Sequence, residues 1–361
     1  MSSGPINMPP ERPILDDPAL LEMLWSDMKQ QDALHRAGPY WDGKIRNSHR
    51  LIRRFGLAEF RDTAIATSFA DAPQIDLTQQ LAGTKYGRVL PWILRHTPMY
   101  SAVLAVQCRW TKDSVDREEE TQAKLFTALG GDWLDAMLHE FPSLPRGSSE
   151  GSASRMLWRG EDFSSYYLHM LSYIDSVRKS GLDFEQVETV MEIGGGIGAN
   201  LHLMLNLFPN IKRAVLVDLP PVAYVAGQYL GKFFGKVLTY RETRGQESIH
   251  FTPDQKEPEI LVITPWQLPQ LRTEIDLAWS SHTFAEMTTD QITFYLREIA
   301  SRLQSTGELV LISYDDISGG ALPVDAVTAL ASRRFAIEKI AAEEWSWYWS
   351  SQLFRGRARN T

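Results

Sequence analysis

The 361-residue chain has one cysteine, Cys108, so it cannot form an internal disulfide. A single thiol in a chain of this length is typical of a reducing compartment, and we expect a cytoplasmic protein. No apolar run approaches the ~20 residues of a membrane span, so no membrane partner is expected. Basic residues are outnumbered, 37 Lys and Arg against 45 Asp and Glu, for a net charge of −8. This balance argues against a nucleic-acid partner, since nucleic-acid-binding proteins usually present a basic face.

Strand signals are scarce before residue 185, and helical patterns occur instead. Asp17 followed by a proline predicts a helix start, and further helices are predicted over 47–60, 90–109, 118–129, 132–141 and 162–177. Residues 1–15 lack the apolar core of a secretion signal and are expected to form a flexible tail. Turn-forming residues at 143–152 predict a linker or mobile loop. We therefore predict a helical domain over residues 16–185.

From about residue 186, short apolar runs alternate with helical stretches. This pattern predicts an α/β domain over residues 186–361, with a parallel sheet and crossover helices. Strands are expected at 189–193, 214–217, 236–240, 260–264, 275–280 and 308–313, and helices at 199–207, 221–234 and 289–303. The remainder predicts a final antiparallel pair of strands near 335–340 and 347–354.

The most informative segment is a glycine turn between two apolar runs. Val190-Met-Glu-Ile-Gly-Gly-Gly-Ile-Gly198 precedes a predicted helix, and Val215-Leu-Val-Asp218 ends in a carboxylate. Glycines let a cofactor approach the backbone closely, and an acid at this distance accepts hydrogen bonds from ribose hydroxyls. A tight turn with an incidental surface acid is the alternative, but the strand, helix and acid together favour binding of an adenosine-containing cofactor.

Two cofactors fit this unit. Gly194, Gly196 and Ala199 match the G-x-G-x-x-A spacing of nicotinamide dinucleotide sites, where Asp218 would select the unphosphorylated form. Glu192, however, lies where it would repel a pyrophosphate and attract an ammonium group. The strand–turn–helix unit also follows a long helical region, whereas many dinucleotide domains begin near the N-terminus. The elements that remain after it are too few for a complete dinucleotide-binding sheet. Together these features favour S-adenosylmethionine.

The same residues resemble class I S-adenosylmethionine-dependent methyltransferases, over about residues 160–315. A narrower similarity is to the bacterial sugar O-methyltransferase family. It rests on Glu-Ile-Gly-Gly-Gly paired with Val-Asp-Leu-Pro, and on Trp279-Ser-Ser-His282-Thr-Phe-Ala-Glu286-Met287. The resemblance implies a Rossmann-like, seven-stranded methyltransferase sheet with a reversed final strand. It also implies that the N-terminal helices form a lid or substrate-binding domain.

The resemblance further implies roles for the cofactor-binding residues. Glu192 would meet the methionine ammonium, Gly194 and Gly196 would line the cofactor, and Asp218 would bind the ribose. Trp266 and Gln267 would lie beside the adenine, although Trp266 as a packing residue is an equal alternative. Tyr167, with its neighbour Tyr166, is a candidate contact from the lid side, and core packing is the alternative.

Among the eight histidines, only His282 follows the end of a predicted strand, where α/β sheets place reactive groups. We assign it as a candidate general base, with a structural histidine as the alternative. Glu286, four residues later, would orient the imidazole or bind an acceptor hydroxyl, or is simply an acid favoured at a helix start. These two residues, with Asp315 or Asp316, are too weak a set to predict a metal.

The resemblance suggests a small-molecule acceptor, in particular a sugar or glycosylated metabolite. N-methylation of an amine, an NAD-dependent oxidoreductase and a non-catalytic binding protein remain alternatives. The aromatic cluster at residues 345–349 would stack on a flat acceptor, pack on a helix or form a dimer contact. A homodimer therefore stays open.

Overall fold

An eight-stranded mixed sheet organises the part of the chain that the structure describes. The computed structural model describes residues 13–57, 131–148, 155–253, 256–314, 321–340 and 351–359. The helices predicted over 90–109 and 118–129, the aromatic cluster at 345–349, Cys108, Asp315 and Asp316 lie outside these residues.

The strand order is β5-β6-β4-β3-β7-β8-β10-β9, and every neighbouring pair is parallel except the two pairs made by β10. The strands are β3 (Thr189–Ile193), β4 (Arg213–Val217), β5 (Lys236–Leu238), β6 (Glu259–Ile263), β7 (Ile275–Ser281), β8 (Leu303–Tyr314), β9 (Phe335–Ile340) and β10 (Ser351–Ala358). The predicted α/β fold with one reversed strand is confirmed. The additional edge strand predicted at 236–240 is β5, which brings the seven strands to eight.

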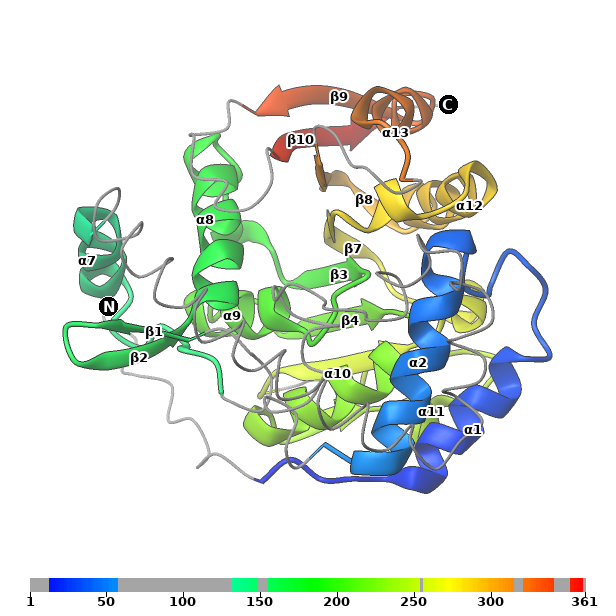
Figure 1. Ribbon diagram of the computed structural model, residues 1–361. Coiled ribbons are helices and arrows are strands. Elements are labelled where there is room, and N and C mark those ends of the chain that lie inside the picture. Colours follow the sequence, from blue (N-terminus) through cyan, green and yellow to red (C-terminus); the bar gives the residue numbers. More distant parts are fainter. Residues whose placement is uncertain are drawn as a thin grey trace, which may run out of the picture.

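Alternation along the central strands separates two apolar layers. In β3, Val190 lies in the core formed with α8 (Ser165–Lys179), α9 (Ala199–Leu207) and α10 (Pro220–Phe233). Met191 points to the opposite core, formed with α12 (Thr289–Ala300) and α13 (Val324–Ala331). Successive side chains of a strand point to opposite faces, and a parallel strand covered on both sides is apolar throughout. Figure 1 shows the resulting sandwich of helices around the sheet.

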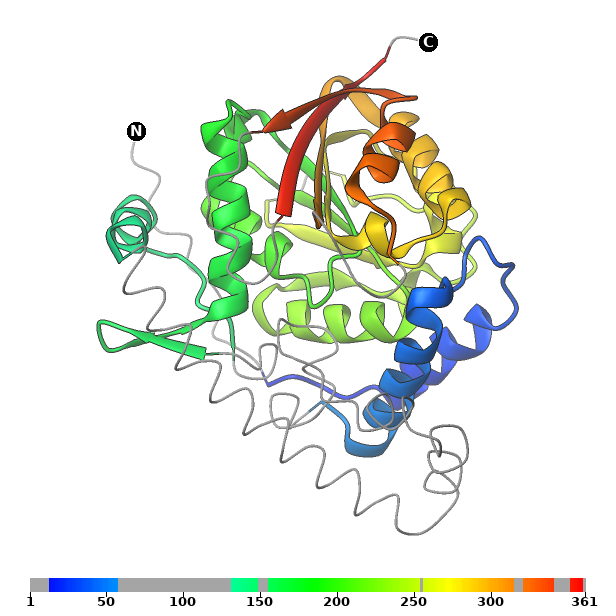
Figure 2. The same ribbon diagram turned by 45° about the horizontal axis from the view of Figure 1, so that its top comes forward.

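The first two helices, α1 (Pro18–Met28) and α2 (Pro39–Phe55), pack against α10. Asp17 caps α1 by accepting a hydrogen bond from the backbone N–H of Leu20, as its sequence predicts. Leu24 of α1 and Ile52 of α2 belong to the same core as the sheet, as do residues of α7 (Gly131–Glu140). Figure 2 shows the blue helices α1 and α2 against the α10 side of the sheet. The described part of the predicted helical domain therefore shares its core with the sheet.

Several boundaries differ from the sequence prediction. A hairpin of β1 (Arg155–Trp158) and β2 (Glu161–Ser164) lies where no strand was predicted. Helix α8 consequently begins at Ser165, after the cap residue Ser164. Helix α2 begins eight residues before the predicted start at 47, because Pro39 occupies the first helical position. No helix in the described ranges is long and apolar enough to cross a membrane.

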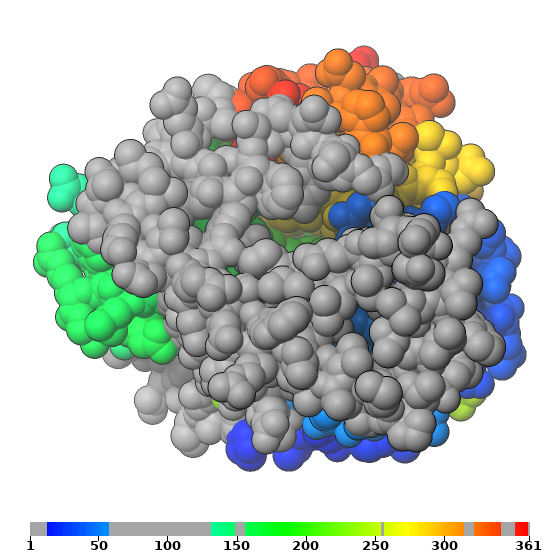
Figure 3. Space-filling view, viewed as in Figure 1, coloured from blue at the N-terminus to red at the C-terminus, as the bar shows by residue number. Residues whose placement is uncertain are grey.

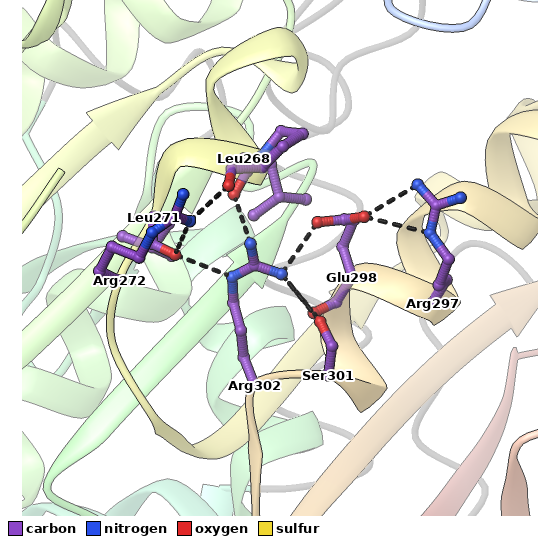
Figure 4. A network of polar contacts seen from close by, with 8 residues as sticks. Leu268, Leu271, Arg272, Arg297, Glu298, Ser301 and Arg302 are labelled. Carbon is purple, nitrogen blue, oxygen red and sulfur yellow. Dashed lines mark hydrogen bonds and ion pairs between the residues drawn. The ribbon is translucent and has the colours of Figure 1, made fainter. Parts of the chain in front are cut away.

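An arginine network fixes the loop after β6 to the end of α12 (Figure 4). The Arg302 guanidinium donates to the carbonyl oxygens of Leu268, Leu271 and Glu298 and to the Glu298 carboxylate. Leu268 belongs to the 3₁₀ helix η3 (Pro265–Gln270), which follows β6. The Arg302 and Glu298 side chains are each 11% exposed. This guanidinium therefore satisfies several acceptors that have little access to water.

We expect Arg302→Ala to lower the free energy of unfolding by about 3 kcal/mol, because it leaves a carboxylate and three carbonyls with one donor fewer each. Denaturant unfolding followed by tryptophan fluorescence measures the effect. Arg297→Ala is the matched control, since Arg297 also binds Glu298 but is 57% exposed. It should cost less than about 1 kcal/mol. Equal losses in both variants would contradict this account of the network.

Candidate cofactor and active site

Most of the sequence-predicted site residues gather at the carboxyl ends of four adjacent strands, β6, β4, β3 and β7. Glu192 is in β3, Asp218 directly follows β4, and His282 directly follows β7. Trp266 follows β6. In Figure 1 the arrowheads of β3 and β4 point towards α2, which places this helix beside the same edge of the sheet. This edge is where open α/β sheets bind their ligands.

The glycine turn after β3 has room for glycine alone at two positions. Gly194 has φ +73°, and a Cβ there would lie 2.1 Å from Thr283 Oγ1. A Cβ on Gly195 would lie 2.7 Å from Oε2 of Glu192. Real Cβ atoms do not approach neighbours this closely, and L-residues rarely adopt that φ. The turn can therefore lie directly over the Glu192 carboxylate and leave the backbone open towards a ligand.

Glu192 is a buried carboxylate, 1% exposed. Its Oε1 accepts a hydrogen bond of 2.7 Å from Asn200 Nδ2, and Oε2 has no hydrogen-bond partner among the described residues. Burial raises the pKa of Glu192 to about 8, with the Asn200 hydrogen bond acting against it and nearby Asp218 adding to it. A buried carboxylate oxygen of this kind is favourable only beside a cation. This fits the ammonium group of S-adenosylmethionine and not a pyrophosphate.

Asp218 is fixed to the glycine turn by backbone hydrogen bonds. Its Oδ2 accepts from the N–H of Gly196 at 3.1 Å, and its Oδ1 accepts from the N–H of Leu219 at 2.7 Å. Burial raises the pKa of Asp218 to about 7, opposed by these two bonds and reinforced by Glu286. The carboxylate thus stands beside the turn at the position predicted for a ribose-binding acid, and that role stays a prediction.

His282 adopts a left-handed backbone conformation, φ +64°, at the start of the short 3₁₀ helix η4 (Thr283–Glu286). Its N–H donates to the carbonyl of Ile312 in β8 at 2.7 Å, and its Nε2 lies 3.0 Å from the hydroxyl of Tyr173 in α8. Burial, with a contribution from His169, lowers the pKa of His282 to about 3. The imidazole is therefore neutral at physiological pH, and the same burial lowers its affinity for a proton.

Glu286 is bound by the N-terminal helix α2. Its Oε2 accepts a hydrogen bond of 2.8 Å from Trp41 Nε1. Burial raises the pKa of Glu286 to about 7, opposed by Lys44, Trp41 and Tyr40. The Lys44 Nζ lies 3.7 Å from the centre of the Tyr40 ring, a cation–π contact. The described hydrogen bonds join Glu286 to α2 and the His282 ring to Tyr173, and none joins Glu286 to the imidazole. A role for Glu286 in orienting the imidazole therefore stays a prediction.

The remaining predicted residues have partners within the protein. Trp266 is half-buried and donates to the Tyr240 hydroxyl at 3.3 Å, so its ring is held at the end of β6. The Gln267 amide binds Thr264 and Thr243 and therefore caps η3. An adenine contact by either stays a prediction.

Tyr167 is 1% exposed. Its hydroxyl lies 2.7 Å from His202 Nδ1 and donates to the Tyr229 hydroxyl at 3.1 Å, between α8, α9 and α10. Tyr166, its neighbour, is partly buried against the same core. These contacts match the core-packing alternative for Tyr167, whose predicted cofactor contact no observation tests.

Four residues of this site escaped the sequence prediction: Asn200, Thr283, Tyr173 and Trp41. Asn200 had a local signal, because it is a polar residue between Ala199 and Leu201 at the predicted start of a helix. Thr283 donates to the carbonyl of Gly194 at 3.2 Å and so ties the loop after β7 to the glycine turn. Trp41 lies 245 positions from its partner in the sequence. No local sequence pattern could have shown that Trp41 and Glu286 are in contact.

No group of three His, Cys, Asp or Glu side chains suited to a metal ion occurs in the described ranges.

In Figure 3 the blue surface of the N-terminal helices lies along one side of the molecule, and the green hairpin β1–β2 lies on the other.

A protein-family comparison decides between the two cofactors. Residues 165–242 match the O-methyltransferase domain family. The matched range runs from the start of α8 past β5 and includes Glu192, the glycine turn and Asp218. The chain is an S-adenosylmethionine-dependent methyltransferase. No curated protein matches its sequence.

Solved structures of other methyltransferases are similar to this methyltransferase. Human N-acetylserotonin methyltransferase in complex with SAM is 15% identical, with a TM-score of 0.36, and the match covers 54% of this chain and 52% of that one. Mitomycin 7-O-methyltransferase MmcR is 13% identical, with a TM-score of 0.36 and coverage of 88% and 99%. The N-methyltransferase NodS from Bradyrhizobium japonicum WM9 is 16% identical, with a TM-score of 0.35 and coverage of 52% and 94%.

We expect the affinity for S-adenosylmethionine to fall as the pH drops below about 8. The raised pKa means that Glu192 gains a proton there, and a neutral carboxyl no longer attracts an ammonium. The dissociation constant should rise about tenfold per pH unit between pH 8 and 6. Calorimetric titrations with S-adenosylhomocysteine, which keeps the ammonium, measure it.

Glu192→Gln is the matched control, because the amide keeps the shape and cannot titrate. It should bind weakly at pH 8.5 and show a much flatter pH dependence. The same steep dependence in this variant would assign the titration to another group.

Proposed function

We propose that the methyltransferase transfers its methyl group to a hydroxyl oxygen of a small molecule, with His282 as general base. The observation that carries this proposal is the position of His282. It directly follows β7, next to the strand that bears Glu192. A left-handed backbone at a non-glycine residue is strained, and such residues concentrate at functional sites.

The bound cofactor supplies a methyl carbon on a positively charged sulfur, which keeps the electron pair of the broken C–S bond. The protein supplies binding, orientation and proton transfer. Glu192 binds the ammonium, and the glycine turn and Asp218 hold the adenosine half. His282 removes the hydroxyl proton of the acceptor while the oxygen lone pair forms the new bond. A positioned base contributes roughly 10²–10⁴-fold to such a step.

A sugar or glycosylated acceptor is the finer form of this proposal. The sequence motifs around Glu192, Asp218 and His282 support it. The rings of Tyr40 and Trp41 beside the Glu286 carboxylate add an apolar face next to a hydrogen-bond acceptor, a pairing suited to the CH face and hydroxyls of a sugar.

We also propose that α2 is the lid. Trp41 anchors it to Glu286, and Lys44 places a positive charge near the same carboxylate. The remainder of the predicted helical domain lies partly outside the described residues. A lid that excludes water strengthens every electrostatic interaction beneath it.

Replacing His282 tests the base. His282→Asn removes the titratable ring, and Asn tolerates the left-handed backbone, so the loop should keep its shape. We expect kcat to fall roughly 100-fold or more, while the affinity for S-adenosylhomocysteine stays within about twofold. The acceptor for this assay is the one found by incubating the protein with methyl-labelled S-adenosylmethionine and candidate hydroxyl compounds and identifying the product by mass spectrometry.

A small decrease in kcat with a nitrogen-methylated product would favour the amine-methylating alternative, because a neutral amine needs less help from a base. Cofactor binding without any turnover over a broad acceptor panel would favour the non-catalytic alternative.

Replacing Trp41 tests the lid. Trp41→Phe keeps an aromatic ring and removes the N–H that binds Glu286. We expect S-adenosylhomocysteine to dissociate roughly 10- to 100-fold faster in stopped-flow measurements, since one charge-assisted hydrogen bond contributes about 1.5–3 kcal/mol.

Trp133→Phe is the control. It removes a similar indole–carboxylate hydrogen bond, to Asp175, away from the sheet edge. Equal dissociation rates in wild type and Trp41→Phe would remove α2 from the role of lid.

A further inference from the structure

A buried hydroxyl connects the His282 ring to two other elements. Tyr173 is in α8 and is 4% exposed. Its oxygen lies 3.0 Å from His282 Nε2, 2.7 Å from His169 Nε2 and 3.1 Å from Ser351 Oγ. His169 stands one helical turn before Tyr173, and Ser351 begins the reversed strand β10. Among the residues that the structure describes, three polar groups thus lie around this phenolic oxygen.

The chemistry of a phenol limits how these contacts are shared. A tyrosine hydroxyl donates one hydrogen bond and accepts up to two. Its oxygen lies 3.1 Å from Ser351 Oγ, which can accept its proton. The oxygen can then accept an N–H from each imidazole, which satisfies all three contacts at once. In this arrangement His282 carries its proton on Nε2.

We propose that Tyr173 is the positioning residue of His282: it fixes the ring and holds its proton on Nε2, so that Nδ1 is the basic nitrogen. This inference rests on the proposed function of His282. The acceptor's hydroxyl proton then moves to Nδ1, the oxygen keeps the O–H electron pair for the new bond to carbon, and the imidazolium formed keeps its Nε2–H bond to Tyr173. That bond becomes charge-assisted and therefore stronger at the moment of transfer.

The backbone supports the same arrangement. The His282 N–H is bound to Ile312 of β8, so the main chain and the ring are held by different elements. β10 pairs with β8, and Ser351 stands opposite Tyr314 of that strand. The ring of His282 is therefore placed by α8, β8 and β10 together. Groups that orient a catalytic base in this way are the third member of many nucleophile–base arrangements.

The test is the tautomer of His282, measured on the full chain labelled with ¹⁵N-histidine and saturated with S-adenosylhomocysteine. Long-range ¹H–¹⁵N spectra distinguish a protonated Nε2 from a protonated Nδ1, and His282→Asn assigns the signal. We expect a protonated Nε2 in the wild type. A protonated Nδ1 would overturn the proposal even if no variant were made.

Tyr173→Phe adds the kinetic test. It should yield a mixture of tautomers and lower kcat on the order of 10- to 100-fold, less than loss of the base itself, with the KM for S-adenosylmethionine unchanged. Tyr229→Phe is the matched control, because Tyr229 is a buried tyrosine whose hydroxyl bonds Tyr167 and Ser148. It should change neither the His282 tautomer nor kcat.

The outcomes separate this inference from the proposed function. Full activity in His282→Asn would refute the base, whatever the tautomer. A protonated Nε2 that persists in Tyr173→Phe, with kcat unchanged, would refute the positioning role and leave the base in place.

Discussion

The site depends on one carboxylate that folding removes from water. Glu192 is enclosed by the central strand, the glycine turn and Asn200, and only one of its two oxygens has a described hydrogen-bond donor. Such a group is unfavourable in the ionised state until a cation arrives, which is why its pKa lies far above that of an exposed glutamate. The glycine turn leaves room for this carboxylate. A side chain at position 195 would collide with it, so the position is occupied by Gly195. We propose that this arrangement selects a cationic amino-acid cofactor over a diphosphate.

Two further carboxylates, those of Asp218 and Glu286, lie near Glu192 or near each other. Asp218 and Glu286 also have raised pKa values, and each of the three acids lies near another one. Helix α2 brings Lys44 and two aromatic residues to this negative group. The N-terminal segment therefore contributes to the electrostatics of the sheet edge, in addition to any shielding of the ligand. Its apolar face joins the core of the sheet, so the two halves of the described chain act as one folded unit.

The sequence predicted what local patterns encode. The bounds of β3 and α9 were predicted to the residue, because an apolar run, a glycine turn and a helix-like segment follow one another without interruption. The strand positions of Glu192, Asp218 and His282 followed from the same signals. The partners of these residues did not. Tyr173 lies 109 positions from His282 and Trp41 lies 245 from Glu286, and such contacts arise from topology. The hairpin β1–β2 was missed because two four-residue strands are too short to show a period.

The left-handed backbone at His282 restricts how this site can change over evolution. Only a few residue types tolerate that conformation, chiefly glycine, asparagine, aspartate and histidine. On the proposed role of His282 as the base, a descendant that has lost proton transfer while keeping the loop is expected to carry glycine or asparagine at this position. A valine or isoleucine there would instead indicate a rebuilt loop. The residue at this position in related chains thus distinguishes a protein that lost proton transfer but kept the loop from one in which the loop itself was rebuilt.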